Sequence, residues 1–121
     1  MTNIVWFHSH WVWVALATTG LVGLWGLGLA IFKQRPGRAF GIAAALAIVA
    51  MLVQVAAGVA LYVYGLRPLN GFHVFYGILI AVTFSLASVY RAHLARRPAL
   101  WYGLLLLFVM GLGFRAWSNV T

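Results

Sequence analysis

Acidic side chains are missing from this sequence: none of its 121 residues is Asp or Glu, and none is Cys. The absence of cysteine excludes disulfides, iron–sulfur clusters and thiolate metal ligands. The absence of carboxylates leaves the 8 Lys and Arg side chains with no acidic side chain to pair with. It also argues against a proton-coupled carrier, which usually needs a titrating carboxylate or a comparable group inside the membrane.

Charge of either sign is scarce, since only 7% of the residues are charged whereas 65% are hydrophobic. Soluble domains carry about a quarter charged residues. The formal net charge of +8 comes from basic residues in short connections between apolar runs. We therefore interpret the charge as a membrane-topology signal, and we expect a lipid bilayer and no nucleic acid as partner.

Four stretches contain no Lys or Arg: residues 1–32, 39–66, 68–90 and 98–114. About 20 apolar residues in a helix cross a hydrocarbon core of ~30 Å, and a backbone in lipid must satisfy its own hydrogen bonds. The first stretch follows no basic segment and no A-x-A cleavage site, which predicts a retained helix. The sequence thus predicts an all-α fold: one domain, residues 1–121, forming a four-helix up-down transmembrane bundle.

The basic residues are distributed unevenly between the connections. Six of the 8 flank the first and third connections, which lie on one side of an up-down bundle: Lys33, Arg35, Arg38, Arg91, Arg96 and Arg97. The positive-inside rule makes that side cytoplasmic. We expect an integral protein of a prokaryotic cytoplasmic membrane, with both termini and the second connection on the outer side.

Three of the four histidines, His8, His10 and His73, lie at the predicted outer ends of the first and third helices. His8 and His10 are separated by about 200° around a helix, so only one of them can face the bundle. Small and weakly polar residues continue the His8 face, which favours His8 as the inward residue. The alternative is that both histidines lie at the water interface, among anchoring tryptophans.

A faint internal repeat points the same way. The pair "FH" occurs at Phe7-His8 and at Phe72-His73, and each pair is followed by "RP", at Pro36 and at Pro98. If the repeat reflects duplication, the first and third helices are equivalent and parallel. In an up-down bundle such helices lie diagonally across the core.

Two inward histidines at one depth on diagonal helices suit the iron of a haem, whose macrocycle needs an apolar slot. We expect small residues to line this slot, together with Gln54: Ala47, Ala50, Ala57, Gly58, Gly65, Gly77, Ala81 and Ser88. Residues of this size are also typical of ordinary helix packing in membranes, so they do not identify haem by themselves.

Two arginines fall at the outer side, against the general bias: Arg67 in the second connection and Arg115 near the end of the fourth helix. A buried cation needs a counter-charge, and the two propionates of a haem match guanidinium groups well. We expect Arg67 and Arg115 to bind these propionates, with His8 and His73 as iron ligands. The alternatives are contact with lipid phosphate or with an acidic residue of another subunit.

The segment "LVQVAAGVALYVYGLRPLNGFHVFYGILIAV", residues 52–82, resembles the second-to-third helix region of four-helix membrane b-type cytochromes and one half of a haem A synthase bundle. The resemblance implies that His73 is a haem ligand. The glutamate typical of haem A synthase sites is absent, which argues against that activity. His93 is 20 residues from His73, about 30 Å along a helix, and we expect it at the basic cytoplasmic interface.

These observations predict a membrane protein that binds one haem b near the outer face and takes part in electron transfer, as a carrier or subunit rather than an enzyme. The alternative is an accessory subunit without haem. Such a subunit would fill or stabilise a larger respiratory or photosynthetic membrane complex.

Overall fold

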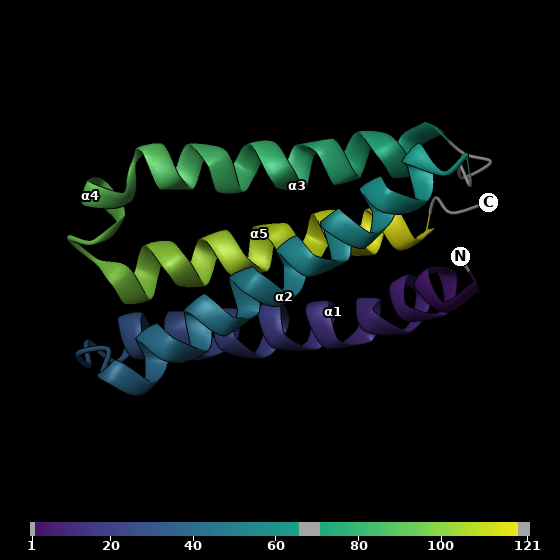
Figure 1. The fold of residues 1–121 in the computed structure, drawn as a ribbon. Helices are drawn as coiled ribbons and strands as arrows, with labels where there is room; N and C mark the ends of the chain where they lie inside the picture. The colour runs from purple at the N-terminus through teal and green to yellow at the C-terminus, as the bar shows by residue number, and fades with distance from the viewer. Residues whose placement is uncertain (1, 66–70, 119–121) are drawn as a thin grey trace.

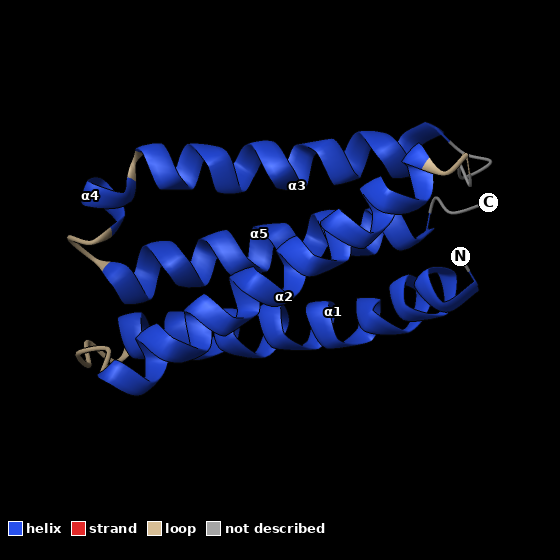
Figure 2. Cartoon of the chain, viewed as in Figure 1, coloured by secondary structure: helices blue, strands red, loops and turns tan. Residues whose placement is uncertain are grey.

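The computed structural model describes residues 2–65 and 71–118, and this part of the chain is helical with short connections (Figures 1 and 2). Its helices are α1 Thr2–Ile31, α2 Arg38–Val63, α3 Gly71–Val89, α4 Arg91–Leu94 and α5 Pro98–Ser118. The described residues include no strand.

Four of the helices, α1, α2, α3 and α5, are long and apolar enough to cross a membrane. The predicted all-α four-helix transmembrane bundle is therefore confirmed, and the chain is an integral membrane protein. The single turn α4, between α3 and α5, was not predicted. The last helix continues to Ser118, beyond the uncharged stretch that ends at residue 114, so Arg115 belongs to the helix and lies near its end, as expected.

The bundle has two distinct ends (Figure 1). At one end lie the α1–α2 connection, α4 and the start of α5, and we call this the basic end because it carries six of the 8 Lys and Arg residues. At the opposite end α1 and α3 begin and α2 and α5 finish (Figure 1). We call it the histidine end, since His8, His10 and His73 lie there.

Local backbone chemistry ends the first two helices. Lys33, with φ of 54°, and Gly65, with φ of 87°, adopt the left-handed conformation that commonly follows a helix. Beyond the end of α1, the amide of Gln34 donates to the carbonyl of Leu29 at 2.8 Å. At the start of α5, Pro98 occupies the first helical position, where its missing N–H costs nothing.

Helix α1 is the centre of the packing, because it contacts both α2 and α5 along its length. At the basic end, glycines let α1 and α5 approach closely. A Cβ added at Gly26 would lie 2.7 Å from the carbonyl oxygen of Ala99, and one at Gly103 would lie 2.9 Å from the backbone nitrogen of Leu27. Small residues at such crossings are the usual basis of close helix packing in membranes.

Helix α3 packs mainly against α5, and its only buried residues are Ile80 and Phe84. Between the described parts of α1 and α3 there is no backbone packing, although the two helices run in the same direction (Figure 1). The two helices are thus not neighbours, which agrees with the diagonal arrangement expected if the internal repeat reflects duplication.

Gly103→Ala should lower the stability of the bundle, because the added methyl group would clash with the backbone of α1 at Leu27. Overpacking of this kind costs about 1–3 kcal/mol, measurable as a lower free energy of unfolding in detergent by circular dichroism. Gly111→Ala is the matched control on the same helix, since a Cβ there meets no atom within 4 Å. Equal stability of the two variants would contradict the close crossing.

Candidate functional site

The histidine pair predicted from the sequence comes together at the histidine end. The ring centres of His8 and His73 are 6.1 Å apart, and their planes form an angle of 86°. Both side chains are half-buried, whereas His10 is exposed and stacks on Trp6 with a centroid distance of 4.5 Å. The predicted inward orientation of His8 is confirmed, and its role as a ligand stays a prediction.

A hydrogen bond to α5 holds the His73 ring. Its Nδ1 lies 2.7 Å from the carbonyl oxygen of Ala116. A carbonyl can only accept, so Nδ1 carries the hydrogen and Nε2 of the neutral ring keeps a lone pair. Ala116 is in the last turn of α5, where carbonyls lack helical partners. Metal-bound histidines typically have their second nitrogen fixed in this way.

Helix α2 surrounds His8 with two residues one turn apart. Gln54 is 9% exposed, and its Nε2 donates to the backbone carbonyl of His8 at 2.8 Å. Gly58 leaves room for the ring, because a Cβ there would lie only 3.0 Å from His8 Cε1. The spacing Gln-x-x-x-Gly therefore both anchors the α1 backbone and accommodates its histidine.

Two buried polar atoms at this place have no hydrogen-bond partner among the described residues: Nδ1 of His8 and Oε1 of Gln54. An unsatisfied buried polar group costs about 1–3 kcal/mol. A metal ion bound by a ring nitrogen would fix the tautomer of His8. It would thus determine whether the remaining nitrogen offers a hydrogen to the amide oxygen of Gln54.

The distance between the two ring centres, 6.1 Å, is the one expected for two imidazoles on opposite sides of one metal ion. Metal–nitrogen distances of ~2 Å, with ~1 Å more from nitrogen to ring centre, place two opposed imidazole centres about 6 Å apart. No group of three or more His, Cys, Asp or Glu side chains occurs in the described residues. A bare ion would thus be under-coordinated, whereas the iron of a macrocycle needs only two axial ligands.

The predicted slot residues divide between two roles. Gly58 contacts His8, and Gly77 has no atom within 4 Å of an added Cβ, so both leave space on the histidine-bearing side. Ala47 is fully buried in a cluster with Phe40 and Leu106, which is the helix-packing alternative.

A third interhelical hydrogen bond near the site, like those of Gln54 and His73, was not predicted from the sequence. The indole nitrogen of Trp11 donates to the carbonyl of Ala50 at 2.8 Å and thereby joins α1 to α2. A tryptophan near a helix end is so common in membrane proteins that its pattern alone does not distinguish an inward from an outward ring.

Only one of the two predicted propionate-binding arginines, Arg115, lies within the described residues. Arg67 lies outside the described residues. Arg115 is exposed in the last turn of α5, next to the Ala116 whose carbonyl accepts the His73 hydrogen bond. The fourth histidine, His93, is exposed in α4 at the basic end, as expected, with its ring 5.2 Å from that of Trp101; the cytoplasmic side of this end stays a prediction.

Comparison with known proteins gives no relative: no protein-family model, no curated protein and no solved structure matches this chain.

His73→Phe should destabilise the protein in the absence of any ligand, because the carbonyl of Ala116 loses its donor and α3 loses a tie to α5. Single interhelical hydrogen bonds in membranes are worth about 0.6–1.7 kcal/mol, detectable by unfolding in detergent. His10→Phe is the control, since the hydrogen bonds of His10 among the described residues stay within α1, to the carbonyl of Trp6 and the hydroxyl of Ser9. A larger loss for His10→Phe would contradict the assignment.

Proposed function

We propose that this protein binds one haem b at the histidine end, with His8 and His73 as the two axial ligands, and functions in electron transfer. The observation that carries the proposal is the pairing of these rings, 6.1 Å apart, on two helices whose backbones do not contact each other. A bound haem would supply one-electron chemistry at its iron, which neither histidine has alone.

The described residues have separate tasks in this proposal. His73 presents Nε2, because its Nδ1–H is engaged by the Ala116 carbonyl. Gln54 holds the α1 backbone at His8, and Gly58 leaves the space in which the His8 ring stands. Together these contacts keep both rings at a fixed separation before any ligand arrives, which lowers the ordering cost of binding.

Arg115 and Arg67 bind the two propionates. In support, Arg115 is exposed in the last turn of α5. The next residue in that turn, Ala116, accepts the hydrogen bond of His73. The chain itself has no acidic side chain to compete for either guanidinium. Charge-assisted contacts between guanidinium and carboxylate are stronger than those between neutral groups.

The basic end faces the cytoplasm of a prokaryotic cell, in line with the positive-inside rule, and both termini lie outside. The haem then sits near the outer face, and a single haem at that depth does not carry electrons across the whole bilayer. Its partners are a quinol, a periplasmic cytochrome or an adjacent membrane subunit.

An accessory subunit without haem is the second candidate function. It is favoured by the loose attachment of α3, whose outward residues Ile78, Val82, Leu86 and Val89 are exposed. Another subunit of a respiratory or photosynthetic complex could cover this face as readily as lipid.

His8→Ala and His73→Ala should each abolish retention of haem, because one axial imidazole does not replace two. The measurement is a reduced-minus-oxidised visible spectrum of protein purified after expression with added haem precursor. His10→Ala and His93→Ala are the matched controls, since both side chains are exposed, with His10 stacked on Trp6 and His93 beside Trp101 at the basic end. If the His8 and His10 effects were exchanged, the ligand assignment on α1 would be wrong, and haem-free wild type would favour the accessory subunit.

Arg115→Gln should lower the midpoint potential of the bound haem, and so should Arg67→Gln. Reduction adds one negative charge, and the lost cation no longer offsets it, so the reduced state becomes less favourable. Redox titration measures the shift, and Arg38→Gln at the basic end is the control. Equal potentials in all three variants would leave Arg67 and Arg115 as lipid or subunit contacts.

A further inference from the structure

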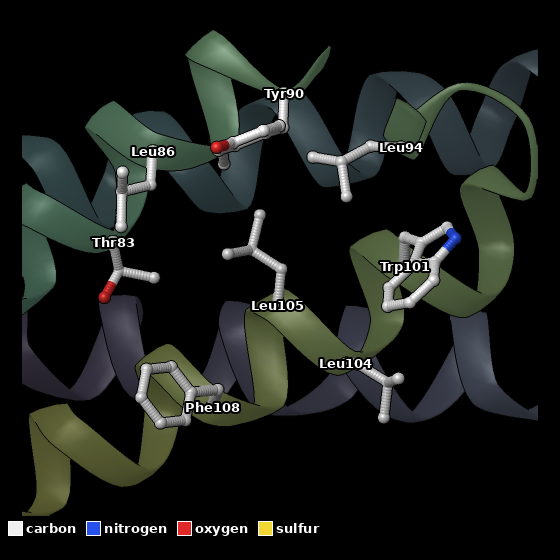
Figure 3. Close-up of a pocket in the computed structure, with 9 residues that line it drawn as sticks. Thr83, Leu86, Tyr90, Leu94, Trp101, Leu104, Leu105 and Phe108 are labelled. Carbon is white, nitrogen blue, oxygen red and sulfur yellow. The ribbon is translucent and has the colours of Figure 1, made fainter. Parts of the chain in front are cut away.

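A groove runs between α3 and α5 at the basic end, far from the histidine pair (Figure 3). Its volume is about 380 Å³, and its walls are almost entirely apolar. Leu105 projects from α5 into the space between the two helices, opposite Tyr90, and Phe108 lies further along α5 (Figure 3). Helix α3 packs mainly against α5, and the groove between them is largely open on its outer side.

Amphipathic aromatic rings mark the mouth of this groove. Tyr90 and Leu94 bound it on the α3–α4 side, and Trp101 bounds it on α5 with its indole nitrogen toward the α4–α5 connection (Figure 3). Tyrosine and tryptophan favour the level of lipid headgroups, where the ring is apolar and the polar atom meets water. The apolar part of the groove therefore lies at acyl-chain depth and its mouth at headgroup depth.

Basic residues adjoin the mouth of the groove in the sequence. Arg91 follows Tyr90 directly and donates to the carbonyl of Ser88 at 2.9 Å, and Arg96 and Arg97 precede α5. All three side chains are exposed, and the chain contains no Asp or Glu to neutralise them. Basic clusters beside transmembrane helices attract anionic lipids at about 1 kcal/mol per Lys or Arg.

We infer that this groove is a binding site for an anionic phospholipid. One acyl chain lies in the groove against Leu105 and Phe108, and the phosphate contacts Arg91 and Arg97 at the mouth. The basic residues beside the mouth select this occupant over a zwitterionic lipid, and the open apolar walls accept a flexible chain. The site is independent of haem binding, because it lies at the opposite end of the bundle.

The test uses the full chain in detergent, titrated with phosphatidylglycerol or with phosphatidylcholine of the same acyl chains, and native mass spectrometry counts the lipids retained. Phosphatidylglycerol should bind more tightly. The double variant Arg91→Gln with Arg97→Gln should weaken its binding by about fivefold for each arginine. Arg35→Gln with Arg38→Gln removes the same charge from the other connection at this end and should have little effect.

Filling the groove tests the acyl-chain half of the site. Ala87 lines the groove, so Ala87→Phe should reduce phosphatidylglycerol retention. Ala56→Phe on the exposed face of α2 should not. The proposal is overturned if both arginine pairs act equally, if phosphatidylcholine binds as well as phosphatidylglycerol, or if Ala87→Phe retains the lipid.

If the Ala87→Phe variant loses its helical circular dichroism, a second experiment tests acyl-chain binding without filling the groove. It uses phosphatidylglycerol with brominated acyl chains at a low molar ratio to the protein. Bromine on the acyl chain quenches nearby tryptophan emission. Trp101→Phe should remove most of this quenching, because Trp101 lines the groove. Trp13→Phe should leave the quenching unchanged, because Trp13 is on α1 and does not line the groove. Quenching that does not depend on Trp101 overturns the proposal.

Discussion

Side-chain N–H groups bonded to backbone carbonyls of a neighbouring helix hold the histidine end together. Trp11 donates to Ala50, Gln54 to His8, and His73 to Ala116, each at 2.7–2.8 Å. A chain without carboxylates has few other strong acceptors, and in lipid no water replaces them. Because His8 contributes one of these carbonyls and His73 one of the donors, the same contacts that join the helices also position the two rings.

The two ends of the bundle are stabilised by different physics. At the basic end α1 and α5 meet backbone to backbone through Gly26 and Gly103, with no space for a side chain between them. At the histidine end the helices separate enough to admit imidazole rings, and directional hydrogen bonds replace close packing. Helix α3 packs mainly on α5, and α5 packs on α1. The spacing of the histidine pair therefore depends on the position of α5 relative to α1.

The helices, their up-down order and the diagonal placement of α1 and α3 could be predicted because hydrophobic length and connection length decide them. The choice of His8 over His10 followed from helix periodicity and the small residues on one face. The bond from His73 to Ala116 could not be predicted, because it depends on the rotation of α5 and on which carbonyl is left unpaired at its end. The turn α4 and the α3–α5 groove depend on how a short basic connection folds back, which periodicity does not address.

The central claim is that two half-buried imidazoles from diagonal helices share one haem iron. It is tested most directly by measuring the haem content and spin state of the purified wild-type protein. The account predicts about one haem b per chain with the low-spin electron paramagnetic resonance spectrum of iron held by two imidazoles. A folded protein that takes up no haem, or whose haem is high-spin with an open axial position, would contradict it.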